Sequence, residues 1–291
     1  MPDPVIPLHQ PIIVGTAVEI RPGRVLDVAV HAGRKANAPV VFFCHGAGGN
    51  KDQWRIQWQT LANEGYSLVA WDLYGHGDSP KPDQPAAYAW DELVEDYLAI
   101  LSRYSGPRNV LVAHSFGTGL TLSVLSRLCS ARPGPQVESA LLLGSLLTRP
   151  AFRPGLLSLP AWALTLIRPW LARSFRLRAW HPQANPALVA YEDKLTERNE
   201  LYVFKALTSQ ARWPTLEQLG ALELPVCVLA GDWDGLTPAE SGRALAEHLP
   251  NARFDVLPAC GHQLMLEKPS AVLSVLRMLL IEHPVSSRSV H

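Results

Sequence analysis

Hydrophobic residues along the chain form short runs that alternate with longer stretches of helical spacing. Runs such as Val40–Cys44, Ser67–Asp72 and Asn109–Ala113 are short and mainly apolar, as in strands that are buried on both faces. Between them, Lys51–Glu64 and Tyr88–Arg103 place their apolar residues at helical spacing. This alternation predicts an α/β fold, a sandwich with a mostly parallel central sheet.

The same pattern continues on both sides of one interruption. Pro22-Gly23 divides an opening hairpin, and the alternation resumes near residue 225. The further expected strands are Val14–Ile20, Arg24–His31, Val137–Leu143, Pro225–Ala230 and Arg253–Leu257, and the further expected helices are Phe116–Ala131, Ala239–His248 and Glu267–Glu282.

The interruption covers residues 145–215, where repeated prolines cut helix-like pieces and no strand pattern is visible. We interpret this segment as an inserted helical cap, or lid. The core would then consist of two parts, residues 1–144 and residues 216–283, and residues 284–291 would form a flexible tail.

Composition limits the classes of protein that the chain can belong to. Its 291 residues carry 26 basic and 26 acidic side chains, so the formal net charge is zero, which argues against nucleic acid as a partner. With 47% hydrophobic and 18% charged residues, the chain can bury a large core and is not intrinsically disordered.

Cysteine spacing and the N-terminal residues bear on the compartment. The four cysteines form no CxxC pair, which favours free buried thiols over a zinc site or a disulfide framework. Met1–Val14 contains no Lys or Arg and lacks the features of a signal peptide, and no uncharged stretch has the character of a membrane span. We therefore expect a cytoplasmic protein.

The strongest chemical motif is Ala113-His114-Ser115-Phe116-Gly117, which lies between a predicted strand and a predicted helix. A serine on such a tight turn is held with its hydroxyl outward above the sheet, and its neighbours must be small, as Ala113 and Gly117 are. A serine in an ordinary strand–helix loop is the simpler alternative.

A serine hydroxyl needs a base and an orienting acid to become a nucleophile. His262 follows the last predicted strand, and Asp234 follows the strand Pro225–Ala230. Ser115, Asp234 and His262 thus all come after strand carboxyl ends, where open α/β sheets place their sites. Their order along the chain, serine, then aspartate, then histidine, is the order found in one particular fold that catalyses acyl transfer.

Five motifs in this order resemble the α/β-hydrolase superfamily, in its capped serine esterase and lipase branch. They are Phe43–Gly49, Asp72–Ser79, Ala113–Gly117, Gly231–Pro238, and Gly261-His262 followed by Glu267-Lys268-Pro269. The resemblance implies that Ser115 is the nucleophile, His262 the general base and Asp234 the orienting carboxylate. It also implies an oxyanion hole formed by the backbone N–H groups of Ala47 and Phe116, with no metal and no cofactor.

Several neighbouring residues compete for these roles. Asp232 could replace Asp234 as the acid, although the spacing to Pro238 favours Asp234. His45 and His76 match family positions that mostly shape loops, and His114 lies beside Ser115 within the turn, so we do not expect these histidines to act directly in catalysis. We expect Cys260 to serve packing. A serine at the turn also disfavours the dehalogenase and epoxide-hydrolase branches, which use other nucleophiles.

The predicted cap has a charge and composition of its own. Between Ser139 and Tyr191 there are six arginines and no Asp or Glu, mixed with many Leu and Trp residues. Such a segment either packs its apolar side on the core or rests on anionic lipid, peripherally at the inner membrane surface. In both cases we expect an apolar pocket ceiling and a small hydrophobic ester or lipid-like substrate.

The leading hypothesis is therefore a serine hydrolase that cleaves carboxylic esters through an acyl-enzyme. A thioesterase, an acyltransferase or a carbon–carbon bond hydrolase would use the same triad. The His-x4-Asp pattern of some acyltransferase-like relatives is not matched, because Glu267 stands at that place. A non-catalytic lipid-binding or partner-binding scaffold is the alternative from another class.

Overall fold

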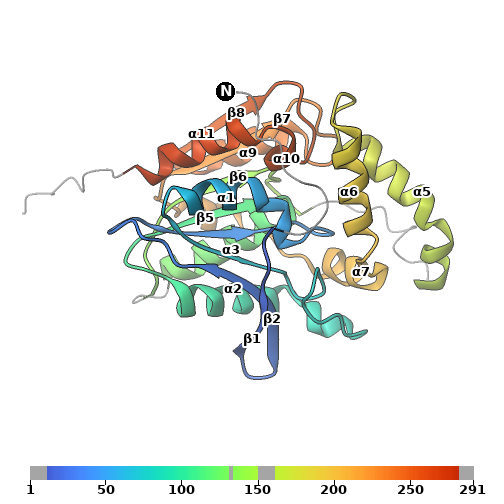
Figure 1. Cartoon of the computed structure of the whole chain (residues 1–291), viewed down its shortest axis with the longest axis horizontal. Helices are drawn as coiled ribbons and strands as arrows, with labels where there is room; N and C mark the ends of the chain where they lie inside the picture. The colour runs from blue at the N-terminus through green and yellow to red at the C-terminus, as the bar shows by residue number, and fades with distance from the viewer. Residues whose placement is uncertain (1–11, 131–133, 150–160, 282–291) are drawn as a thin grey trace, which may run out of the picture.

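An eight-stranded sheet forms the centre of the computed structural model, which describes residues 12–130, 134–149 and 161–281. The strand order is β1-β2-β4-β3-β5-β6-β7-β8; β2 is antiparallel to β1 and β4, and the strands from β4 to β8 are parallel. This confirms the expected mostly parallel sheet (Figure 1). The strands are β1 Thr16–Arg21, β2 Arg24–His31, β3 Val40–Cys44, β4 Ser67–Trp71, β5 Asn109–His114, β6 Val137–Leu143, β7 Val226–Gly231 and β8 Ala252–Leu257.

Helices cover both faces of the sheet. Residues of α1 and α11 belong to one buried cluster and residues of α2, α3 and α9 to the other, and Figure 1 shows α11 and α1 on the opposite side from α2 and α3. The core helices and helical turns are η1 Lys51–Trp54, α1 Arg55–Asn63, η2 Pro85–Tyr88, α2 Trp90–Tyr104, α3 Phe116–Ser130, α8 Leu216–Gly220, α9 Ala239–His248, α10 Leu264–Glu267 and α11 Pro269–Leu280.

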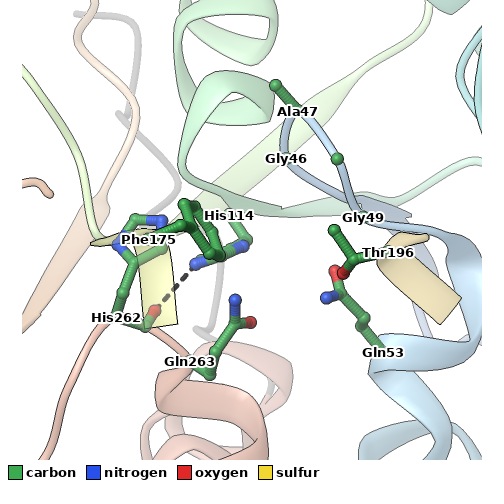
Figure 2. A pocket seen from close by; sticks show the side chains of 10 residues that line it. Gly46, Ala47, Gly49, Gln53, His114, Phe175, Thr196, His262 and Gln263 are labelled. Atoms are coloured by element: carbon green, nitrogen blue, oxygen red, sulfur yellow. Dashed lines mark hydrogen bonds between the residues drawn. The ribbon is translucent and has the colours of Figure 1, made fainter. Parts of the chain in front are cut away.

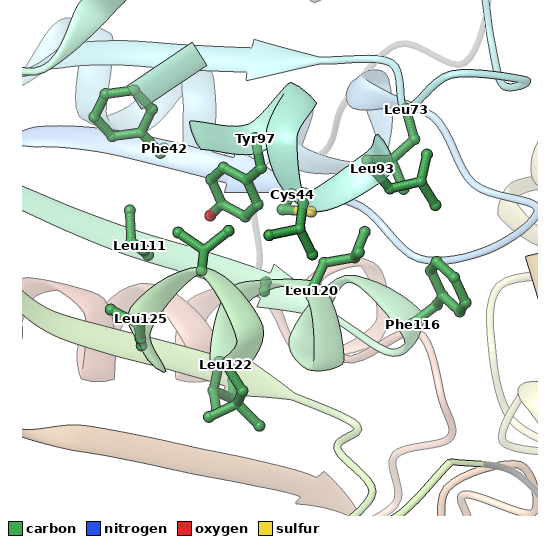
Figure 3. Packing of buried hydrophobic residues seen from close by; sticks show 14 of the residues in the cluster. Phe42, Cys44, Leu73, Leu93, Tyr97, Leu111, Phe116, Leu120, Leu122 and Leu125 are labelled. Atoms are coloured by element: carbon green, nitrogen blue, oxygen red, sulfur yellow. The ribbon is translucent and has the colours of Figure 1, made fainter. Parts of the chain in front are cut away.

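The central strands send successive side chains to opposite clusters, because the side-chain period of a strand is two residues. In β3, Phe42 and Cys44 join the cluster under α2 and α3, whereas Val41 and Phe43 join the cluster under α1 and α11. Figure 3 shows the first cluster, where Leu120 of α3 lies among these side chains. Burial on both faces explains why the strands are apolar throughout.

The chain between β6 and β7 forms helices joined by loops where it is described. It contains α5 Ala161–Ala179, α6 Pro186–Thr196 and α7 Leu201–Gln210, which Figure 1 places together at one end of the sheet. The domain boundaries at residues 145 and 215 stay predictions. Residues 150–160 and the expected tail at 284–291 lie outside the described residues.

Parallel register brings the carboxyl ends of the central strands to one edge of the sheet. Cys44 at the end of β3 pairs with Ala113 of β5, and Leu143 of β6 pairs with Leu229 of β7. The loops that follow β3, β5, β7 and β8 therefore meet at this edge, where open α/β sheets bind their ligands. These are the loops that carry the residues singled out by their motifs.

Candidate active site

Ser115 lies in a strained turn between β5 and α3. Its φ of 52° is in the left-handed region, which residues other than glycine rarely adopt. Any larger residue at position 117 would displace the neighbouring backbone, because a Cβ there would lie 2.5 Å from the carbonyl oxygen of His45. The small residue and the strained serine are those that a nucleophile turn requires.

Asp234 and His262 form a buried pair at the same edge. His262 Nδ1 lies 2.8 Å from Asp234 Oδ2, and both residues are at most 5% exposed. The other carboxylate oxygen, Oδ1, accepts hydrogen bonds from the amides of Leu236 at 2.9 Å and Thr237 at 2.8 Å. The Asp234 carboxylate is thus held in place and orients the imidazole ring.

The charge state of Asp234 follows from its surroundings. Burial alone would raise its pKa, but the charge of His262 and hydrogen bonds from His262 and Thr237 outweigh burial and hold the pKa of Asp234 below its usual value. The Thr237 hydroxyl donates to Asp234 Oδ2 at 2.6 Å and lies 3.1 Å from His262 Nδ1. Sequence reasoning gave Thr237 no role, although a hydroxyl residue three positions after an Asp is a recognisable turn signal.

Ser115 is a neighbour of this pair through backbone contacts. Its amide donates to the carbonyl of Leu143 at 2.9 Å, and the next residue, Gly144, packs against the His262 ring, because a Cβ on Gly144 would lie 3.3 Å from His262 Nδ1. No hydrogen bond joins the Ser115 hydroxyl to His262 in the part of the chain that the structure describes. The nucleophile–base contact therefore stays a prediction; such contacts often tighten only when substrate binds.

The expected oxyanion loop packs directly on the serine. A Cβ on Gly46 would lie 2.8 Å from Ser115 Cβ, so only glycine allows this approach. The Gly48 amide donates to His76 Nε2 at 3.0 Å. The Phe116 ring is edge-on to Trp90 with centroids 5.3 Å apart, which anchors its side chain in the core. The donor roles of Ala47 and Phe116 stay predictions.

The three other histidines singled out in the sequence motifs, His45, His76 and His114, have structural partners. His45 Nε2 accepts from the Leu73 amide at 2.9 Å, and His114 Nε2 lies 2.8 Å from the carbonyl oxygen of His262. Burial, the largest cause, lowers the pKa of His45 to about 4 and the pKa values of His76 and His114 to about 3. All three are therefore neutral at neutral pH, and His114 braces the loop that carries His262.

Asp232 and Glu267 stabilise the loop around His262 by accepting hydrogen bonds from its backbone amides. Asp232 accepts hydrogen bonds from the amides of Ala259 at 2.9 Å and Cys260 at 3.0 Å. Glu267 accepts from the amides of His181, Gly261 and Gln263 at 3.0 to 3.2 Å. Neither carboxylate bonds the His262 ring, so both are positioning residues.

Helix α5 is hydrogen-bonded to the loops that carry Asp234 and His262. The His262 amide donates to the carbonyl of Ala179 at 2.7 Å, and the Gly235 amide donates to the carbonyl of Arg178 at 2.9 Å. These carbonyl groups belong to the last turn of α5, where no helical partner is available to them. The cap is therefore bonded to the loops of the Asp234–His262 pair.

One group of carboxylates has the spacing of metal ligands among the described residues, namely Asp27, Asp72 and Asp78. The Lys51 ammonium lies inside it, 2.6 Å from Asp27 and 2.8 Å from Asp72. Burial would lower the pKa of Lys51, but the two carboxylates outweigh burial and raise it. Lys51 therefore supplies the positive charge that this cluster needs.

A small pocket opens beside His262 (Figure 2). It is lined by residues 46–49, His114 and His262, by Gln53 and Gln263, and by Phe175 and Thr196. Phe175 and Thr196 come from the segment between β6 and β7, so one of the two lining side chains from this segment is apolar and the other is polar. The apolar ceiling expected for this segment stays a prediction.

Comparison with known proteins identifies the family of the chain. The model of the alpha/beta hydrolase family matches residues 41–275, and the chain belongs to this family. The superfamily indicated by the motifs is thereby confirmed.

Individual relatives and solved structures show which proteins this chain resembles. Protein ABHD8 from Bos taurus is 32% identical over 253 residues, which are 85% of this chain and 57% of that protein. The chain thus spans little more than half the length of this relative. An esterase from Exiguobacterium antarcticum superposes with a TM-score of 0.78 at 17% identity, covering 92% of this chain and 100% of that one. A bromoperoxidase from Bacillus anthracis has a TM-score of 0.77 at 17% identity with the same coverage. These two structures share the fold.

Proposed function

We propose that this alpha/beta hydrolase cleaves carboxylic esters through an acyl-enzyme at Ser115. The observation that carries the proposal is the buried Asp234–His262 pair, with its 2.8 Å contact, at the sheet edge where Ser115 lies in its strained turn. An imidazole held by a carboxylate is the base that a serine hydroxyl needs.

The reaction follows from these positions. The Ser115 hydroxyl attacks the ester carbonyl while His262 takes its proton, and the Ala47 and Phe116 amides stabilise the oxyanion. His262 then gives the proton to the departing alkoxide, which leaves Ser115 acylated. Water, deprotonated by His262, attacks the acyl-enzyme, and the carboxylic acid and free serine are released.

A panel of p-nitrophenyl esters with short to long acyl chains tests the ester specificity. We expect nitrophenol release with several esters, and a maximum beyond acetate if the substrate is hydrophobic. Product analysis in the presence of a competing alcohol and of thioester substrates separates a hydrolase from an acyltransferase or a thioesterase. Absence of turnover with all esters, together with turnover of a thioester or a carbon–carbon substrate, would contradict the proposal.

We further propose that α5 contacts an anionic membrane surface from which a lipid-like ester is taken. Leu166, Trp170 and Leu177 are 74%, 64% and 68% exposed, and with Arg173 they follow the spacing i, i+4, i+7, i+11 of one helix face. Exposed Trp and Leu beside Arg, on a segment without acidic residues, suit an interfacial helix. No described helix is long and apolar enough to cross a membrane.

Vesicle sedimentation tests this contact. We expect the protein to pellet with vesicles of equal parts phosphatidylcholine and phosphatidylglycerol, and less with phosphatidylcholine alone. Trp170→Ser should weaken this binding by removing apolar area, and Arg173→Gln should weaken it about fivefold. Met278→Ser on α11, also an exposed apolar position at 52%, is the matched control. Binding that ignores both lipid charge and Trp170→Ser would rule the contact out.

A further inference from the structure

The pocket beside His262 contains two buried carbonyl oxygens that accept no hydrogen bond. They belong to the carboxamides of Gln53 and Gln263, whose residues are 4% and 6% exposed. A buried acceptor without a donor costs stability, so such groups usually have a partner that the protein alone does not supply. Figure 2 shows both carboxamides directed into the space between His262 and Thr196.

Gln53 is held in this orientation by a buried ionic network. Its Nε2 group donates to Glu192 Oε2 at 3.4 Å, and Glu192 Oε1 lies 2.7 Å from a guanidinium nitrogen of Arg55. Because a carboxylate can only accept here, the NH2 group of Gln53 faces Glu192. Its oxygen faces Gly49, another residue of the pocket lining, where a Cβ would lie 2.3 Å from it. The network joins η1 and α1 to α6.

Gln263 enters the pocket from the loop that carries the proposed base. The backbone amide of Gln263 donates to the Glu267 carboxylate at 3.2 Å, and the backbone carbonyl of Gln263 accepts from the Glu267 amide at 2.8 Å. These two bonds fix the backbone next to His262. The cavity has a volume of about 20 Å³, enough for one small polar group or one water molecule. Two acceptor oxygens facing one such space call for a donor.

We propose that Gln53 and Gln263 form a subsite that accepts hydrogen bonds from a hydroxyl or amide N–H group of the substrate. This inference rests on the proposed ester hydrolysis and specifies its substrate class. Because Ala47 and His262 line the same cavity, the donor lies close to the scissile carbonyl, in the acyl part or in the alcohol part. An amphiphilic ester with a hydroxyl beside the ester bond fits both this subsite and the proposed membrane contact.

Paired esters that differ in one hydroxyl test the subsite and locate the donor. The β-hydroxybutyryl and isovaleryl p-nitrophenyl esters place hydroxyl or methyl in the acyl part, and hydroxyethyl and propyl butyrate do so in the alcohol part. We expect kcat/KM of the wild type to favour the hydroxyl-bearing member of one pair about tenfold or more. Gln53→Met and Gln263→Met should each bring this ratio toward one, whereas exposed Gln59→Met should keep it.

The outcomes separate failure of the subsite from failure of the proposed function. Ratios near one in both pairs, or a preference that survives both pocket variants, would mean that a water molecule satisfies the two oxygens and would overturn the subsite. Absence of all hydrolysis would instead overturn the ester chemistry. In that case calorimetric binding of the same pairs to Ser115→Ala still decides the subsite. If Gln53→Met fails to fold, as circular dichroism would show, Gln263→Met, which leaves the Glu192 network intact, carries the test.

Discussion

Replacing Ser115 with alanine is expected to lower kcat/KM for p-nitrophenyl esters by roughly 10⁴- to 10⁶-fold. The reason is that no other hydroxyl lies on the strained turn next to the Asp234–His262 pair, so the covalent route is lost. The rate that remains would come from substrate binding and the oxyanion donors alone. Initial rates of nitrophenol release measure the effect, and a fluorophosphonate probe should add its mass to the wild type at Ser115 only.

Ser102→Ala is the matched control, because Ser102 is an exposed serine on α2, away from the sheet edge. We expect this variant to retain wild-type rates and to be labelled by the probe. Turnover of Ser115→Ala within tenfold of the wild type, or labelling at a different serine, would show that Ser115 is not the nucleophile.

Asp234→Asn is expected to reduce kcat about 10⁴-fold while the protein stays folded. An asparagine is nearly the same shape, but it cannot both accept from His262 Nδ1–H and stabilise the imidazolium that forms during attack. Because the pKa of Asp234 is lowered, the wild-type carboxylate is ionised throughout the neutral and mildly acidic range. Initial rates of ester hydrolysis at neutral pH measure the loss.

Asp232→Asn distinguishes the two acids that the motif offers. The Asp232 carboxylate accepts hydrogen bonds from the amides of Ala259, whose φ is 50°, and Cys260, in the loop just before His262. We expect a loss below about tenfold from looser positioning, together with a lower melting temperature. A larger loss from Asp232→Asn than from Asp234→Asn would reverse the assignment of the orienting acid.

Local pattern was sufficient for the sheet and for the place of the motifs. Each central strand is apolar over its whole length because both of its faces are covered, and the loops after parallel strands must share one edge. From these two facts alone, Asp234 and His262 could be expected to meet, although they are 28 positions apart.

Contacts between distant segments could not be predicted in this way. Gln53 and Glu192 are 139 positions apart, and nothing near either residue indicates that one orients the other. The bond of the Thr237 hydroxyl to Asp234 is local, but its approach to His262 Nδ1 at 3.1 Å joins residues 25 positions apart. The meeting of Gln53 and Gln263 in one pocket was missed for the same reason, since nothing near either residue indicates that the two side chains line the same space.

The bonds from the last turn of α5 to the loops that carry Asp234 and His262 restrict how this helix can move. A displacement of Arg178 and Ala179 would pull on Gly235 and His262, and so would disturb the reactive geometry. Any opening that preserves this geometry must use the end of α5 as its pivot. The travel then increases toward the other end of the helix, so Leu166 would sweep a longer arc than Leu177. The end of α5 that would move farthest in such an opening thus carries an exposed apolar side chain, that of Leu166.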